Sequence, residues 1–200
     1  MLVLASASPR RQELLRNAGI PFTVQPADVD ETPIAGERAR DYAERLAREK
    51  AVKVWQSHLQ DVVLGADTVV VVDGAILGKP ADAADAARML RMLAGRQHEV
   101  ITGVCIVKSV PSRASRVASS EHECIEQNPL VQTLSETTVV TMSEIPDQEI
   151  VDYIATEEPM DKAGAYAIQG RASRWIPRIV GDYTNVVGLP VALVYRLLRS

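Results

Sequence analysis

The sequence has few residues of the kinds that build disulfide frameworks or cysteine–histidine metal sites. Its two cysteines, Cys105 and Cys124, form no CxxC pair, which excludes a framework of disulfide bridges. The three histidines, at positions 58, 98 and 122, have no metal-ligand spacing, and no serine lies in a GxSxG elbow. A zinc hydrolase and a serine hydrolase of that type therefore have no support in the sequence.

Long apolar segments are also lacking. No stretch approaches the length that spans a bilayer, and the start of the chain, MLVLASASPRR, does not have the pattern of a secretory signal. We therefore expect a soluble, cytoplasmic protein that has no membrane partner.

A strongly basic surface is the third absence. The chain has 22 lysines and arginines against 26 aspartates and glutamates, a formal net charge of −4. This balance argues against a basic face for nucleic acid, so we predict no nucleic-acid partner. The 200 residues, 46% hydrophobic and 24% charged, are typical of one globular domain with a substantial core.

Strand and helix patterns alternate along the chain, which indicates an α/β fold with one large sheet. Helices are predicted at 9–18, 36–58, 82–94 and 146–156, and after Gly188. Strands are predicted at 2–5, 21–25, 99–108, 131–142, 164–169 and 174–180, with a hairpin at Asp73-Gly74. Residues 109–130 are rich in serine and charge, so we predict a flexible insertion within a single domain of residues 1–200.

The segment SASPRR, residues 6–11, places two cations at the start of a helix for which Ser8 is the predicted N-cap. A helix N-terminus already carries partial positive charge, so Arg10 and Arg11 are unfavourable there unless an anion sits over them. Backbone N–H groups, the Ser6 hydroxyl and two guanidinium groups suit phosphate oxygens. The alternative is a capped surface helix whose arginines are solvated.

Asp67 and Thr68 interrupt the run LGADTVVVV, which otherwise predicts a buried strand. An unpaired carboxylate in such a strand is costly, so Asp67 is expected to be hydrogen-bonded, to hold a metal ion or to act as a base. The alternative is a bend or bulge at Gly65 and Asp67. A functional role is favoured because the strand pattern resumes at once.

Several other charged residues are each more typical of a solvated surface than of a site. If they converge in space, carboxylates beside lysines would suit a hydrated magnesium ion that carries a polyphosphate. They are Asp28, Asp30, Glu31, Lys50, Lys79, Asp161 and Lys162. The segment GAILGKP is not a P-loop, because its spacing is one residue short and Pro80 stands where serine or threonine is needed.

Five motifs occur in the order in which the Maf family has them: SASPRRQELL, GADTVV, GKP followed by a helix ending MLAGRQHEVITGV, DKAGAYAIQG and GDYTNVVGLP. Apart from residues 109–130, the whole chain resembles a Maf-type nucleoside triphosphate pyrophosphatase. The resemblance implies an α/β fold in which an elongated mixed sheet is flanked by helices, with a cleft between two lobes. It also implies hydrolysis between the α and β phosphates, a divalent cation (Mg²⁺ or Mn²⁺) and a homodimer.

The resemblance also implies roles for individual residues. The family's proton acceptor falls on Asp67, which together with Glu31 is expected to hold the metal ion or to orient the attacking water. The specificity positions of the family fall on Arg10, Thr68 and Gln169. Further polar positions of the family's pocket match Ser6, Arg11, Glu31, Lys50 and Lys79.

DKAGAYAIQG resembles the branch of the family that acts on dTTP and UTP, which implies a house-cleaning role against non-standard nucleotides, including modified pyrimidine nucleotides. The Gln169 amide has the acceptor and donor to pair with the O4 and N3–H edge of thymine or uracil, but it could also bond another base edge. Three alternatives stay open: the same chemistry on 7-methyl-GTP, a non-catalytic regulator of septum formation, and a module that binds nucleotides without cleaving them.

Overall fold

The computed structural model describes residues 1–110 and 129–200. The strands are β1 (Leu2–Leu4), β2 (Thr23–Val24), β3 (Val62–Val72), β4 (Ala75–Leu77), β5 (Gln97–Ser109), β6 (Pro129–Thr141) and β7 (Arg178–Val180). The α-helices are α1 (Pro9–Asn17), α2 (Ala39–Trp55), α3 (Ala83–Leu93), α4 (Asp147–Ile154), α5 (Tyr183–Val187) and α6 (Val191–Arg199). Short 3₁₀ helices are η1 (Glu158–Asp161), η2 (Ala163–Ala165) and η3 (Arg171–Trp175).

The strands form one seven-stranded sheet in the order β2-β1-β3-β5-β6-β7, with β4 paired to β3. β1 runs parallel to β2 and β3, whereas the other pairs are antiparallel. A mixed sheet with helices packed against it confirms the predicted fold class. Within the described ranges, no helix is both long and apolar enough to cross a membrane.

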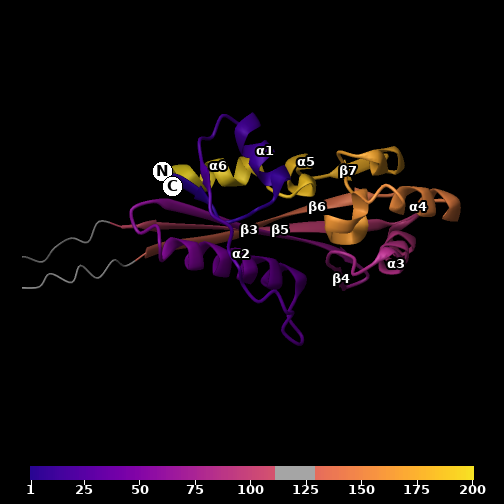
Figure 1. Cartoon of the computed structure of the whole chain (residues 1–200), viewed down its shortest axis with the longest axis horizontal. Helices are drawn as coiled ribbons and strands as arrows, with labels where there is room; N and C mark the ends of the chain where they lie inside the picture. The colour runs from indigo at the N-terminus through magenta and orange to yellow at the C-terminus, as the bar shows by residue number, and fades with distance from the viewer. Residues whose placement is uncertain (111–128) are drawn as a thin grey trace, which may run out of the picture.

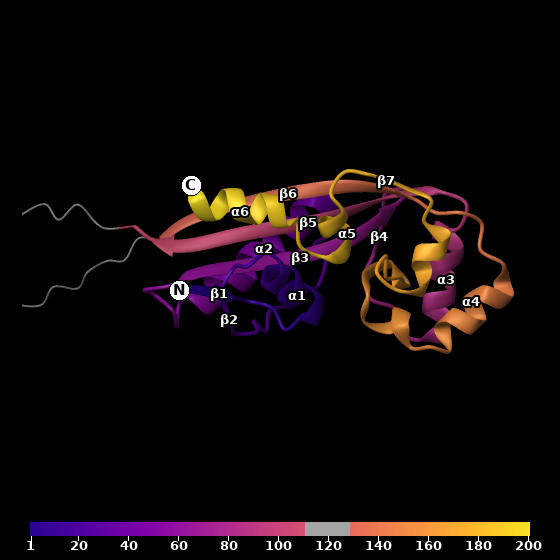
Figure 2. The same ribbon diagram turned by 90° about the horizontal axis from the view of Figure 1, so that it is seen from above.

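Helices gather at the two ends of the long strands β3, β5 and β6 (Figures 1 and 2). The first lobe, at the end near both termini, contains β1, β2, α1, α2 and α6. The second lobe contains β4, β7, α3, α4 and the three 3₁₀ helices. Because these three strands belong to both lobes, the sheet holds the lobes together, and the predicted two-lobed shape is confirmed.

Side-chain alternation along β3 divides the core of the first lobe into two layers. Leu64 packs with Leu193 and Leu197 of α6 on one face of the sheet, whereas Val63 packs with Ala47 and Ala51 of α2 on the other. Both faces are therefore covered, which explains why β3 has a nearly continuous apolar sequence. The second lobe has a separate cluster beneath α3 and α4.

The Asp73-Gly74 hairpin is confirmed: Val72 pairs with Ala75, and the two turn residues have positive φ values of 50° and 78°. Asp67 lies inside β3, which continues without a break to Val72, so the interpretation as a bend is wrong. Asp67 is therefore a polar residue within a regular β-strand.

Two predictions near the C-terminus are corrected. Residues 164–169 form no strand; they contain the end of η2, where Gly164 has a φ of +70°, and a turn. Ala165, Tyr166 and Ile168 of this segment pack in the core of the second lobe rather than along a sheet. Only Arg178–Val180 of the predicted strand 174–180 pairs with β6. The sequence did not predict α5, which begins at Tyr183 after the N-cap residue Asp182, whose carboxylate accepts from the Thr184 N–H.

Most of the predicted insertion at 109–130 lies outside the described residues. At its edges, Ser109 pairs with Pro129, so β5 and β6 extend into the range predicted as flexible. Backbone pairing between β5 and β6 decides where these two strands end, and this pairing cannot be predicted from the composition of the segment.

Candidate active site

A cleft opens along the edge of β3 between the two lobes. β1 pairs with β3 as far as Leu64, and β4 pairs with it from Val70 onward. The interval between these points contains Asp67 and Thr68, which line a cleft of about 880 Å³. This volume lies within the range of about 300–1,000 Å³ that is usual for small-molecule sites.

Every residue to which the resemblance assigns a role in the site lines this cleft, whereas Asp28 and Asp30 do not. The assigned residues are Ser6, Arg10, Arg11, Glu31, Lys50, Asp67, Thr68, Lys79 and Gln169. They come from both lobes and from segments far apart in the chain. The fold therefore brings the residues together, while their individual roles stay predictions.

The close approach of α2 to the sheet depends on two glycines. A Cβ on Gly65 would lie 2.1 Å from the carbonyl oxygen of Ala47, and a Cβ on Gly103 would lie 2.3 Å from another carbonyl oxygen of α2. Gly103 is the β5 partner of Asp67 in the ladder. Because α2 lies so close to the strands, Lys50, one turn beyond Ala47, reaches the carboxylate of Asp67.

Lys50 joins two carboxylates in a nearly closed corner of the cleft. Its Nζ lies 2.7 Å from Asp67 Oδ1 and 2.6 Å from Glu31 Oε1. Lys50 and Asp67 are only 8% and 9% exposed. Burial raises the pKa of Asp67, although the charges of Lys50 and Arg11 act against it. A buried carboxylate with a raised pKa beside a cation has the properties of a general base.

Glu31 differs from Asp67 in its balance of forces. Burial acts to raise the pKa of Glu31, but the hydrogen bond and the charge of Lys50 outweigh it, so the pKa is lowered. The Glu31 side chain is half exposed, whereas the Asp67 side chain is largely buried. The site therefore holds one ionised, accessible carboxylate and one buried carboxylate on the same ammonium group.

Arg11 is largely occupied by protein acceptors. Its guanidinium donates to the carbonyl oxygens of Gly188 (2.8 Å) and Ala66 (2.9 Å) and to the hydroxyl oxygens of Ser6 and Thr68 (both 3.1 Å). Burial lowers the pKa of Arg11. In this structure Arg11 orients Ser6 and Thr68, and a direct contact with phosphate stays a prediction.

α1 begins at Pro9, as predicted, with Ser8 at the N-cap position. The side chain of Ser8 makes no capping bond to any described residue, and the first turn contains no acidic residue. The Ser8 N–H donates instead to Ser6 Oγ at 3.3 Å. The positive end of α1 can therefore receive an anionic group from the cleft.

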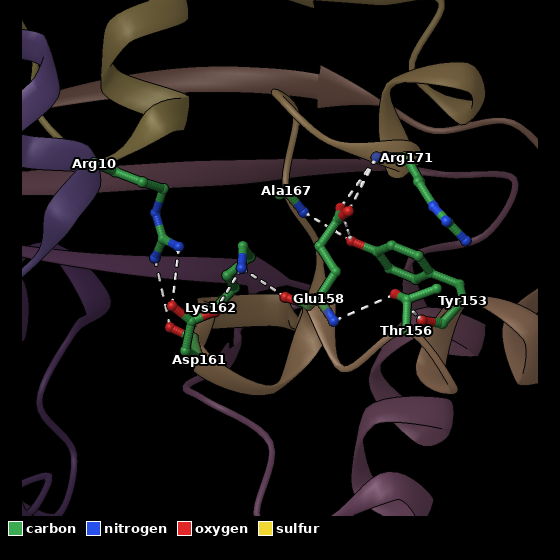
Figure 3. Close-up of polar contacts among 8 residues, drawn as sticks. All are labelled: Arg10, Tyr153, Thr156, Glu158, Asp161, Lys162, Ala167 and Arg171. Carbon is green, nitrogen blue, oxygen red and sulfur yellow. Dashed lines mark hydrogen bonds and ion pairs between the residues drawn. The ribbon is translucent and has the colours of Figure 1, made fainter.

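Arg10 forms an ion pair across the mouth of the cleft. Its Nη1 lies 3.2 Å from Asp161 Oδ2, and Lys162 pairs with the same carboxylate (Figure 3). Arg10 belongs to α1 in the first lobe and Asp161 to η1 in the second. This partly exposed pair links the lobes, and a phosphate group could replace its carboxylate partner.

The second lobe contributes Lys79 and Gln169. Lys79 follows β4, and its charge helps to lower the pKa of Glu31 on the opposite side of the cleft. Gln169 is exposed in a four-residue turn that is closed by a hydrogen bond from Gly170 N–H to the Ala167 carbonyl oxygen (3.1 Å). The second lobe therefore adds one cation and one amide to the lining of the cleft.

The predicted metal ligands, Glu31 and Asp67, both point at Lys50 Nζ. Residues 1–110 and 129–200 contain no group of three or more His, Cys, Asp or Glu side chains that could hold a metal ion. Magnesium is commonly held by one or two carboxylates together with substrate phosphates and water. This donor set therefore fits a divalent cation that binds together with a triphosphate.

Sequence reasoning missed residues that support the site indirectly. The Tyr42 hydroxyl on α2 donates to the Glu31 carbonyl oxygen at 2.7 Å. Asn185, fully buried, donates to the Val100 carbonyl oxygen at 2.9 Å and ties α5 to the sheet. An asparagine within the quoted GDYTNVVGLP motif was the one available signal; nothing in the sequence distinguished Tyr42.

A family model and the sequences of known proteins match almost the whole chain. A family model described as Maf-like protein matches residues 1–200. A protein of Koribacter versatilis named dTTP/UTP pyrophosphatase is 56% identical, with coverage of 99% of this chain and 93% of that protein. One of the same name from Citrifermentans bemidjiense is 48% identical, with coverage of 99% and 94%. A solved nucleoside-triphosphatase / dITP/XTP pyrophosphatase from Mycobacterium abscessus is 17% identical, with a TM-score of 0.39 over 72% of this chain and 75% of that chain.

Proposed function

This chain belongs to the Maf family, and from that premise we propose that it hydrolyses dTTP and UTP to the monophosphate and pyrophosphate. The observation that carries the proposal is the buried Lys50–Asp67 pair, 2.7 Å apart, in a cleft that also contains Arg10 and Gln169. A general base, cationic side chains suited to phosphate and an amide suited to the nucleobase thus line one cavity.

The triphosphate lies with its charge against the start of α1 and Arg10. To bind there it displaces Asp161, because both compete for the same guanidinium. Lys79 and Lys50 complete the positive surroundings of the phosphates. This arrangement answers why a helix begins with arginines: the substrate supplies the counter-charge that the first turn of the helix lacks.

Asp67 acts as the base. Its carboxylate takes a proton from a water molecule, the water oxygen bonds to phosphorus, and the bridging oxygen between the α and β phosphates leaves with pyrophosphate. The charge of Lys50 opposes the rise in the pKa of Asp67 that burial causes, and it stabilises the charge that develops on the phosphoryl oxygens. Positioning and charge stabilisation provide most of the acceleration in reactions of this class.

Glu31 and Asp67 would hold the Mg²⁺ or Mn²⁺ ion. When bound with the triphosphate, the ion neutralises phosphate charge and polarises the phosphoryl oxygens. Tyr42 keeps the Glu31 backbone in place through its 2.7 Å hydrogen bond, and Lys50 holds the two carboxylates on one ammonium group. These residues thus prepare an oxygen-lined position for the cation.

Gln169 reads the base. Its exposed amide lies in the cleft wall formed by the second lobe, opposite the phosphate residues of the first. An amide offers one acceptor and one donor to the O4 and N3–H edge of uracil or thymine. Thr68, held by Arg11 at 3.1 Å, lies on the β3 edge of the cleft as the second expected specificity residue.

Pyrophosphate release from dTTP, UTP, CTP, GTP and 7-methyl-GTP, with Mg²⁺ or Mn²⁺ and with EDTA, tests the proposal. We expect release from dTTP and UTP that depends on metal and is lost in Asp67→Asn. Asp73→Asn, the same substitution at the exposed hairpin turn, is the matched control and should retain activity.

Each other outcome has a defined meaning. Release centred on 7-methyl-GTP would retain the chemistry and contradict the base preference. Binding of nucleotide without release from any member of the panel would favour the binding or regulatory alternatives. The homodimer and the cytoplasmic location stay predictions; light scattering on the purified protein tests the first.

A further inference from the structure

The turn that carries Gln169 is short, and no strand or helix fixes it. Residues 167–170 close on themselves through one backbone hydrogen bond, and Gln169 is exposed. A base-reading amide must nevertheless keep a defined position, because a misplacement of about 1 Å is costly in an active site. The contacts of the flanking backbone groups therefore decide where Gln169 lies.

Two linked side chains hold both ends of this turn (Figure 3). At the start, the Ala167 N–H donates to the Tyr153 hydroxyl oxygen at 3.1 Å. At the end, the Arg171 N–H donates to Glu158 Oε1 at 3.1 Å. The Tyr153 hydroxyl donates to the same Glu158 oxygen at 2.9 Å, so one continuous chain of hydrogen bonds spans the turn from end to end.

Glu158 also fits closely beneath the turn. A Cβ on Gly170 would lie 2.0 Å from Glu158 Oε1, so the turn requires glycine at this position for the carboxylate to approach. Lys162 Nζ donates to the Glu158 carbonyl oxygen at 2.6 Å, and the Glu158 N–H donates to Thr156 Oγ1 at 3.3 Å. Glu158 is thus held on its backbone side as well as by its carboxylate.

Tyr153 is placed by the core of the second lobe. It is 1% exposed, and its ring meets that of Trp175 edge to face, with centroids 5.2 Å apart. Burial raises the pKa of Tyr153, and the hydrogen bond to Glu158 adds to this, so the hydroxyl keeps its proton. The hydroxyl donates a hydrogen bond to the Glu158 carboxylate and accepts one from the Ala167 N–H.

A third contact precedes the turn. His98 Nε2 lies 2.7 Å from the hydroxyl of Tyr166, the residue before Ala167. His98 is 3% exposed on β5, and burial lowers its pKa to about 4, so it is neutral near neutral pH. The sheet therefore holds the segment just ahead of the turn, while Tyr153 and Glu158 hold the turn itself.

We propose that Tyr153 and Glu158 are positioning residues that set the base selectivity of the enzyme by fixing the turn that carries Gln169. This inference rests on the proposed function, in which Gln169 reads the base. Packing alone would need only the ring of Tyr153, which phenylalanine provides. The hydroxyl adds the link between Ala167 and Glu158.

Tyr153→Phe tests the proposal, because it removes the hydroxyl and leaves the ring against Trp175. We expect the KM for dTTP and UTP to rise about fivefold to tenfold, as follows from the loss of a hydrogen bond in a buried network. The preference for UTP over CTP should fall by a similar factor, and kcat should change less than twofold. Tyr195→Phe, which removes an exposed hydroxyl on α6, is the matched control.

Glu158→Ala should give the same split between KM and kcat by a second route. Its control is Glu149→Ala, in the same lobe, where the carboxylate accepts from Trp175 Nε1 at 2.8 Å and forms no hydrogen bond or ion pair with residues 166–171 among the described residues. If both glutamate variants lose base preference equally, loss of lobe stability explains the effect and the proposal is overturned.

A double-mutant cycle with Gln169→Ala decides whether the two residues act through Gln169. In that background, Tyr153→Phe should cause no further loss of base preference. An additional loss of the full size, or a wild-type base preference in Tyr153→Phe alone, would overturn the inference and leave the proposed function standing. A wild type that releases no pyrophosphate from any triphosphate would overturn the proposed function and this inference with it.

Discussion

Gly65 offers the most direct test of how the fold builds the site. It lies on β3 two residues before Asp67, on the face that packs against α2. Lys50 reaches Asp67 only because α2 lies close to the sheet at this glycine. Gly65→Ala adds one methyl group outside the cleft and leaves every residue that lines it unchanged.

The size of the effect follows from the backbone contacts. An alanine Cβ at position 65 would lie 2.1 Å from Ala47 O, where ordinary contact begins at 3.4 Å, so α2 must move by about 1.3 Å. The Lys50 Nζ–Asp67 distance of 2.7 Å would then lengthen toward the limit for a hydrogen bond. Overpacking of this kind costs about 1–3 kcal/mol of stability. A misplacement of about 1 Å in the site lowers the rate by up to about 100-fold.

Steady-state pyrophosphate release from dTTP and thermal unfolding, measured on the same samples, separate the two effects. We expect kcat/KM to fall about 10-fold to 100-fold. Gly19→Ala is the control: Gly19 has a φ of +67° and nothing within 4 Å, so alanine strains the backbone without moving α2. It should lower Tm and retain activity. A Gly65→Ala enzyme with wild-type kcat/KM would refute the reasoning.

Three further predictions concern charges in the cleft. Lys50→Met removes the main charge that opposes the effect of burial on Asp67, so the pKa of Asp67 rises further. The acidic limb of the pH profile of kcat/KM then moves to higher pH, and an unmoved limb would contradict Asp67 as the general base. Asp161→Asn frees Arg10 for phosphate and should lower the KM about twofold to fivefold at low salt, an effect that 0.5 M salt, as a rough guide, should abolish. Arg11→Lys leaves buried acceptors unpaired and should lower stability by about 2–3 kcal/mol, read as a fall in Tm of roughly 5–10 °C; an unchanged Tm would show that the guanidinium bonds contribute little.

Local patterns predicted most of the regular elements well. The hairpin at Asp73-Gly74 and the start of α1 at Pro9 follow from turn and helix-start chemistry that acts over a few residues. Residues 164–169 were predicted as a strand, and they contain a short run of consecutive apolar residues. In the structure, these apolar residues face the core of the second lobe from a 3₁₀ helix and a turn. An apolar run indicates burial, and long-range backbone pairing decides whether a strand forms.

In the candidate site, too, local sequence patterns indicated individual residues, and long-range contacts decided how they are arranged. Asp67 stood out because a carboxylate inside an apolar strand is costly, and the arginines of SASPRR because cations are unfavourable at a helix start. Among the site residues, Gln169 was supplied by the resemblance to a family alone. Their convergence depends on glycine contacts between α2 and the sheet, which involve residues about 18 and 60 positions apart in the chain. The sequence also did not show that Arg10 and Arg11 have different roles: Arg10, partly exposed, pairs with Asp161 at the cleft mouth, whereas Arg11 donates to protein acceptors.

The sequence alone determined the fold class, the family and the residue types that the site requires, because propensity, turn chemistry and motif order are properties of neighbouring residues. Only the tertiary structure decided that Lys50 bridges Asp67 and Glu31, that Arg11 holds Ser6 and Thr68, and that Tyr153 and Glu158 hold the turn of Gln169. Hydrogen bonds and buried ion pairs depend on distances of a few tenths of an ångström between distant segments, and packing sets those distances.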